Sequence, residues 1–141
     1  MSTNLSKEDM VQFLTDLHVA IISVPVNHRG PLTVPIWYFY EPGGEIAFTT
    51  FKTSWKAKLI KIGLRISLCV QDENPPYKYV SVEGPVQAIR DADLEKEIRP
   101  LVYRYLGKED GDQYIEETYP DPKETGELLV QMKPERWYAA G

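Results

Sequence analysis

Short segments rich in β-branched and aromatic residues recur along this chain, and turn residues separate them. Three of these segments, joined by two turns that contain Gly and Pro, cover residues 19–26, 32–40 and 45–50. Because such short turns join neighbouring antiparallel strands, these segments predict an antiparallel meander. Three more strands are predicted at residues 65–71, 77–89 and 128–132.

Helical patterns flank the predicted strands. They predict a short helix capped by Ser6, a helix from Thr53 or Ser54 through Lys61, a helix from Asp91 or Asp93 to Gly107, and a short helix over 109–118. No repeat, low-complexity tract or linker divides the chain, so we expect one domain over residues 1–141. Six short, mostly antiparallel strands with helices outside indicate a mainly β (α+β) fold, a small barrel rather than a parallel α/β sheet.

The cysteine and histidine content excludes several kinds of site. Cys69 is the one cysteine, so neither an intramolecular disulfide nor a zinc site of several thiolates can form. His18 and His28 are the two histidines, and no spacing of residues favours a metal site. No stretch approaches the roughly 20 apolar residues of a membrane helix, and the N-terminus lacks the order of a signal peptide, so we expect a cytoplasmic protein.

Charge is distributed unevenly along the chain. The net charge of −5 argues against nucleic-acid binding, yet residues 52–61 contain four lysines and no acid. This segment follows a predicted strand and opens a predicted helix, and helix N-termini bind phosphates through free backbone N–H groups. The segment therefore predicts an anion site, at which one phosphate would meet Lys52, Lys56 and the hydroxyls of Thr50, Thr53 and Ser54.

A second interpretation of the same lysines stays open, because four lysines on a short helix also form an ordinary solvated face. Lysine near a helix start is mildly unfavourable to the helix dipole, however, so an anionic ligand would explain a placement that stability does not. Hydrolytic catalysis has less support, since no serine or cysteine is paired with a histidine in a recognisable pattern.

Four motifs follow the short N-terminal helix in a definite order. They are Pro31-Leu-Thr-Val-Pro-Ile-Trp37, Lys56-Ala-Lys58, Tyr77-Lys-Tyr-Val-Ser-Val-Glu-Gly84 and Pro134-Glu-Arg-Trp-Tyr138. In this order they resemble the pyridoxamine 5′-phosphate oxidase-like FMN-binding split barrel family, and within it the one-domain flavin and deazaflavin (coenzyme F420-dependent) oxidoreductases. The resemblance covers nearly the whole chain and implies a six-stranded antiparallel split β-barrel with short flanking helices.

The same resemblance implies a cofactor site. Residues 34–37 would lie under the ring, while strand-end hydroxyls and helix lysines would hold the phosphate. The implied cofactor-binding residues are Val34, Pro35, Ile36, Trp37, Thr49, Thr50, Lys52, Ser54, Lys56, Lys58, Tyr79 and Trp137. Trp55 stands where many relatives have arginine, and lysine alone lacks the bidentate phosphate contact of arginine.

The resemblance further implies an oxidoreductase in which reduced coenzyme F420 transfers hydride to a small conjugated or carbonyl-containing substrate. The cofactor carries the reactive carbon, so no catalytic side chain is assigned. The family typically forms homodimers with cofactor sites at the interface, where Tyr77, Tyr79 and Trp137 would reach the partner's site. FMN-dependent oxidation of the pyridoxamine phosphate oxidase type is one alternative, and a flavin- or haem-binding carrier or sensor without turnover is another. No nucleic-acid, membrane or metal partner is implied.

Overall fold

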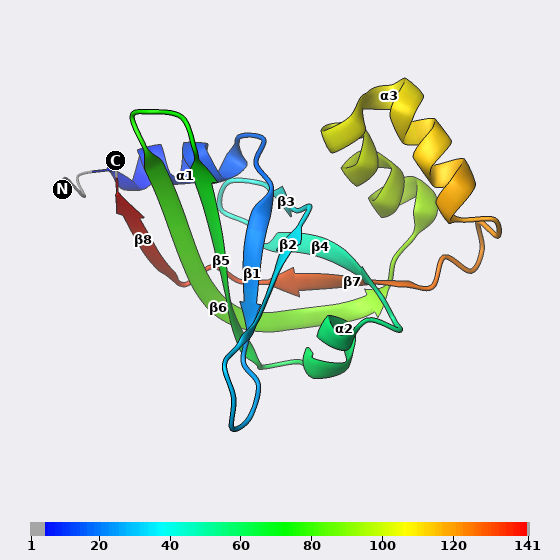
Figure 1. The fold of residues 1–141 in the computed structure, drawn as a ribbon, viewed down its shortest axis with the longest axis horizontal. Helices are drawn as coiled ribbons and strands as arrows, with labels where there is room; N and C mark the ends of the chain where they lie inside the picture. The colour runs from blue at the N-terminus through cyan, green and yellow to red at the C-terminus, as the bar shows by residue number, and fades with distance from the viewer. Residues whose placement is uncertain (1–4, 141) are drawn as a thin grey trace.

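The structure is a computed structural model that describes residues 5–140 (Figure 1). Its strands are β1 (Ala20–Val24), β2 (Leu32–Ile36), β3 (Phe39–Tyr40), β4 (Ile46–Phe51), β5 (Arg65–Asp72), β6 (Lys78–Asp91), β7 (Glu127–Met132) and β8 (Arg136–Ala140). Its helices are α1 (Lys7–Thr15), α2 (Trp55–Leu59), the π-helical segment η1 (Leu94–Ile98) and α3 (Arg99–Thr118). Within residues 5–140, no helix is long and apolar enough to cross a membrane.

All strands belong to one curled antiparallel sheet. Its order is β2-β1-β5-β6-β7-β4-β3, and β8 pairs with β6 as well. Sequence patterns predicted six strands, and the structure has eight. The additional strands are β3, which the two residues after Ile36 separate from β2, and β8, which begins within the motif at residues 134–138. The mainly β, antiparallel prediction is confirmed, but the strand count is wrong.

β6 is the long strand that bends the sheet. Its first part pairs with β5 and β8, and its second part pairs with β7. At the bend, Gly84 passes so close to the next segment that an added Cβ would lie 1.7 Å from the Lys133 carbonyl oxygen. Only glycine fits here, and this contact lets β7 and β8 follow one another along the same edge of β6.

Alternation along the strands produces two opposite faces. One row of register partners faces the core and consists of Val34, Ile22, Leu68, Val82 and Trp137. The next row lies on the outer face of the same strands and consists of Pro35, Ile21, Cys69, Ser81 and Tyr138. The inner face is covered by α1, whose predicted N-cap, Ser6, forms a capping box with Asp9.

η1 and α3 lie at the end of the molecule opposite α1 and β8 (Figure 1). Asp93 caps η1, and α3 contains a kink at Gly107, whose φ of 80° is not helical. The helix predicted to end at Gly107 corresponds to η1 and the first part of α3. The short helix predicted over 109–118 corresponds to the rest of α3, so the two predicted helices are continuous across the kink. Residues of η1 and α3 form a second apolar cluster with Leu129 of β7 and with Trp37. The cavity described below lies between these helices and the sheet.

Candidate functional site

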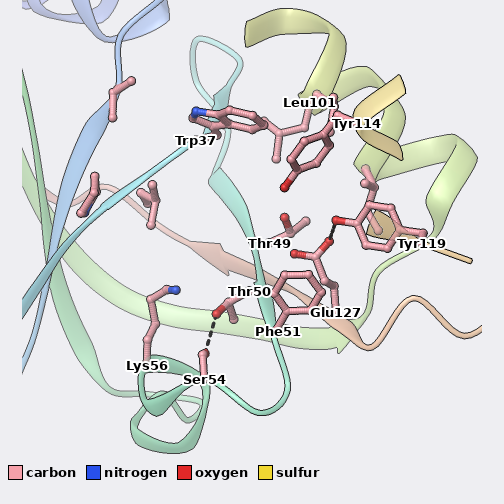
Figure 2. A pocket seen from close by; sticks show the side chains of 15 residues that line it. Trp37, Thr49, Thr50, Phe51, Ser54, Lys56, Leu101, Tyr114, Tyr119 and Glu127 are labelled. Carbon is pink, nitrogen blue, oxygen red and sulfur yellow. Dashed lines mark hydrogen bonds between the residues drawn. The ribbon is translucent and has the colours of Figure 1, made fainter. Parts of the chain in front are cut away.

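A cavity of about 330 Å³ opens between the sheet, α2 and the helices η1 and α3 (Figure 2). Ser54 and Lys56 line the cavity from the start of α2. Pro35 and Ile36 line it from the end of β2, and residues 49–51 line it from the end of β4. η1 and α3 supply apolar wall residues, among them Leu101 and Tyr114. The cavity therefore has a polar end at α2 and an apolar end at the helices.

The polar end is organised by a short hydrogen-bonded chain. The Thr50 and Ser54 hydroxyl oxygens are 2.8 Å apart, and Ser54 Oγ accepts the backbone N–H of Ala57 as N-cap of α2. The cap holds α2 against the end of β4, so that the Lys56 ammonium points into the cavity (Figure 2). Burial lowers the pKa of Lys56, and the attraction of Glu127 opposes this shift. Lys56 forms no ion pair with an acid in the described part of the chain.

Aromatic rings form the opposite end. The Trp37 indole stacks on Tyr105 of α3, with ring centroids 5.0 Å apart, and packs at a tilt on Tyr114 at 5.8 Å. Tyr105 also fixes the backbone, because its hydroxyl donates to the His18 carbonyl and accepts the N–H of Tyr38. These contacts produce a rigid apolar wall against which a flat ring can pack.

Glu127 is the one acid among the residues that line this cavity. It is 6% exposed, and Glu127 Oε2 accepts a hydrogen bond from the Tyr119 hydroxyl. Burial raises the pKa of Glu127, while hydrogen bonds from Tyr119 and Thr49 and the attraction of Lys56 oppose the shift. Burial is the largest of these effects, so the protonated form of Glu127 is favoured over the ionised form more than it is for a carboxyl in water.

The structure brings seven of the twelve sequence-predicted site residues together in this cavity. They are Pro35, Ile36, Trp37, Thr49, Thr50, Ser54 and Lys56. Ser54, not Thr53, caps α2, and α2 ends at Leu59, with Ile60 as its C-cap, rather than at Lys61.

The other five predicted residues do not line the cavity. Val34 and Trp137 lie in the inner row of the sheet and pack on the core, and the Lys7 ammonium lies 3.7 Å from the Trp137 ring centroid. Lys52 pairs with Asp91 at 2.8 Å, and Lys58 is exposed. Tyr79 lies on the outer face of β6 and is 39% exposed.

The sequence did not predict the cavity residues that come from the end of α3 and from β7, above all Tyr119 and Glu127. One signal was present, because Glu127 is two residues before Leu129 and therefore belongs to its face of the strand. An acid in phase with buried strand residues indicates a specific role. Tyr119 reaches Glu127 only because α3 packs against β7, and a local sequence pattern does not predict such a long-range contact.

In sequence, the chain matches no protein-family model and no curated protein. In structure, it is similar to a protein titled F420 reductase, with a TM-score of 0.72 and 20% identity over 89% of this chain and 93% of the other. A conserved hypothetical protein from Mycobacterium tuberculosis gives a TM-score of 0.72 with 18% identity, over 96% and 84% of the two chains.

An FAD-binding protein from Mycobacterium smegmatis gives a TM-score of 0.63 with 13% identity, over 96% of both chains. All three identities are too low to indicate a shared activity, but the structural match extends over nearly the whole chain. The chain therefore shares the split-barrel-like fold of these three proteins.

Proposed function

We propose that this protein is an oxidoreductase that binds the deazaflavin coenzyme F420 and passes hydride to a small conjugated or carbonyl-containing substrate. One observation carries the proposal: a cavity with Lys56 and two hydroxyls at one end has a wall of aromatic and aliphatic residues at the other. This is the division of chemistry that a phosphate joined to a flat ring requires.

The residues present fit the phosphate of such a cofactor. Lys56 supplies a cation without an acidic partner, and Thr50 and Ser54 supply hydroxyl donors 2.8 Å apart. Charge-assisted hydrogen bonds from these groups would fix the phosphate, and the Trp37 side of the cavity would orient the ring. When bound, the cofactor supplies the hydride chemistry; the chain binds it, orients it and excludes water.

FMN is the second candidate, and one finding favours it. F420 carries an acidic glutamate tail that needs further cations, but Lys52 is paired with Asp91 and does not line the cavity. Of the other lysines of the basic segment, neither Lys58 nor Lys61 lines the cavity. FMN needs no such contact, while the fold match to an F420 reductase favours the deazaflavin.

A homodimer belongs to the same proposal, because the outer sheet face suits a second copy of this chain. Its central row consists of small or apolar side chains from Pro35 through Ile21 to Cys69 and Ser81. Pro35 also lines the cavity, so this face continues to the cavity's edge. Tyr77 and Tyr79, 69% and 39% exposed, flank the face and would be carried to the partner's cavity.

Titration of the purified protein with F420, FMN and FAD tests the cofactor assignment. We expect F420 to bind with micromolar or tighter affinity. Tight FMN binding without F420 binding would replace the first candidate by the second. Binding without hydride transfer to any enone, quinone or nitro acceptor would support a carrier or sensor instead.

Sedimentation of the purified protein tests the dimer. We expect a dimer, and we expect Ile21→Glu, which places a charge in the centre of the outer face, to yield a folded monomer. Glu8→Gln, an exposed change on α1, is the matched control and should remain dimeric. A monomeric wild-type protein would contradict the interface.

A further inference from the structure

Glu127 has no role in the cofactor site as proposed so far. It lines the same cavity as Lys56, and Thr50 lies between the two side chains in the view of Figure 2. No ion pair joins Glu127 and Lys56, and both residues line the same cavity of about 330 Å³, which leaves room for a ligand between its walls. A phosphate bound at Lys56 would therefore lie near a buried carboxyl.

An ionised carboxylate would conflict with such a ligand. Removing a carboxylate from water is costly unless donors or cations compensate it, and here Tyr119 is its main donor. A phosphate, whether a monoester or a diester, would bring a further negative charge into the same low-dielectric cavity and compete for Lys56. Two anions in one low-dielectric site disfavour each other's ionised form. The carboxyl, whose ionised form burial already disfavours, is the group that takes up the proton.

We infer that the Glu127 carboxyl must carry a proton when an anionic ligand occupies the Lys56 end of the cavity, so that ligand binding takes up one proton there. This inference rests on the proposed function, in that it needs a phosphate-bearing ligand at Lys56. The proton comes from solvent and returns to solvent on release. Affinity for a phosphate-bearing cofactor then falls as pH rises, and Glu127 determines that fall.

The surroundings of Glu127 support this role. The titratable groups that face it are Lys56 from α2, Tyr119 at the end of α3, and Tyr114 of α3, which acts on Tyr119. On β4 its neighbours Thr49 and Phe51 do not titrate. The charged groups at the neighbouring end of β6 are Arg90, which is paired with Glu97, and Asp91, which is exposed and paired with Lys52. Burial raises the pKa of Glu127, which places its titration nearer to neutral pH.

The test compares cofactor affinity between wild-type protein and Glu127→Gln from pH 5 to 8.5. The probes are FMN and F420, each beside its phosphate-free form, riboflavin or the phosphate-free deazaflavin. Glutamine keeps the shape and still accepts the Tyr119 hydroxyl. Glu124→Gln, an exposed acid in the loop before β7, is the matched control for loss of one charge.

We expect wild type and Glu127→Gln to bind the phosphate-bearing cofactor with equal affinity at low pH. As pH rises, the wild-type affinity should fall relative to that of Glu127→Gln, by up to about tenfold per pH unit. For phosphate-free ligands, the ratio of wild-type to Glu127→Gln affinity should stay constant with pH. For the phosphate-bearing cofactors, the ratio of wild-type to Glu124→Gln affinity should stay constant as well. Calorimetry in buffers of different ionisation enthalpy should detect proton uptake by wild type and less by Glu127→Gln.

A constant ratio of wild-type to Glu127→Gln affinity for the phosphate-bearing cofactor would overturn the inference and leave the proposed function standing. If neither FMN nor F420 binds wild type at any pH, the proposed function fails and the inference with it. If Glu127→Gln does not fold, Tyr119→Phe takes its place. This variant lacks the donor that favours the ionised carboxylate, so the fall in affinity should move to higher pH; an unmoved fall would overturn the inference.

Discussion

The Trp37 indole lies parallel to the Tyr105 ring, with planes 6° apart and centroids 5.0 Å apart. Tyr105 belongs to α3, and Trp37 follows β2, so this stack joins the helices to the sheet directly beside the cavity. The same tyrosine donates its hydroxyl hydrogen to the His18 carbonyl and accepts the Tyr38 N–H. One side chain thus holds three segments in place.

We expect Tyr105→Phe to lower the free energy of unfolding by about 1–3 kcal/mol. The ring stack remains, but the His18 carbonyl and the Tyr38 N–H lose a partner in a partly buried place, which costs the desolvation of those groups. Urea unfolding measures the change. Glu116→Gln, an exposed change on the same helix, is the control and should be neutral. Equal stabilities of the two variants would contradict this role of the Tyr105 hydroxyl.

Gly84→Ala should be strongly destabilising, by roughly 3 kcal/mol or more, because the new methyl meets backbone that cannot move aside. Its Cβ would lie 1.7 Å from the Lys133 carbonyl oxygen, at the bend that seats β7 and β8 on β6. At Gly30, by contrast, an added Cβ meets nothing within 4 Å. Thermal unfolding of both variants should show a large fall for Gly84→Ala and a small change for Gly30→Ala. Similar melting temperatures would refute the close approach.

Strand patterns predicted most of the sheet because alternation of side chains is a local property. β8 was not predicted because Pro134 indicates the end of a strand. The pairing of β8 with β6 depends instead on the bend at Gly84, which is distant in sequence. The polar end of the cavity was predicted for a similar local reason, since Ser54 and Lys56 are neighbours in sequence. Lys52 lies outside the cavity because its partner, Asp91, is brought to it by the pairing of β4, β7 and β6.

Lys56→Ala should weaken cofactor binding by about 1.5–3 kcal/mol, the range for hydrogen bonds to charged groups. The free energy of unfolding should change little, because Lys56 has no acidic partner to lose. Lys58→Ala removes the same charge from an exposed position on the same helix and should bind cofactor like wild type. Fluorescence titration measures both affinities. Equal losses in the two variants would indicate a general charge effect and contradict a phosphate contact at Lys56.

The stability of the protein without ligand should depend on pH through Glu127. Burial raises the pKa of Glu127 in the folded state above its value of about 4.3 in the unfolded chain. Below that unfolded value both states hold the proton, and the contribution of Glu127 is fully present. As pH rises, the unfolded chain releases the proton first, so the free energy of unfolding falls until pH passes the folded pKa.

Glu127→Gln removes this titration and keeps the acceptor for Tyr119. The stability of the variant relative to wild type should therefore rise with pH from about 4.3, the unfolded pKa, and level off above the folded pKa. Every other ionisable group is common to both proteins, so the difference between their urea unfolding curves isolates Glu127. Parallel curves from pH 4 to 8 would mean that the carboxylate ionises in the fold as readily as in water, and a raised pKa would have to be abandoned.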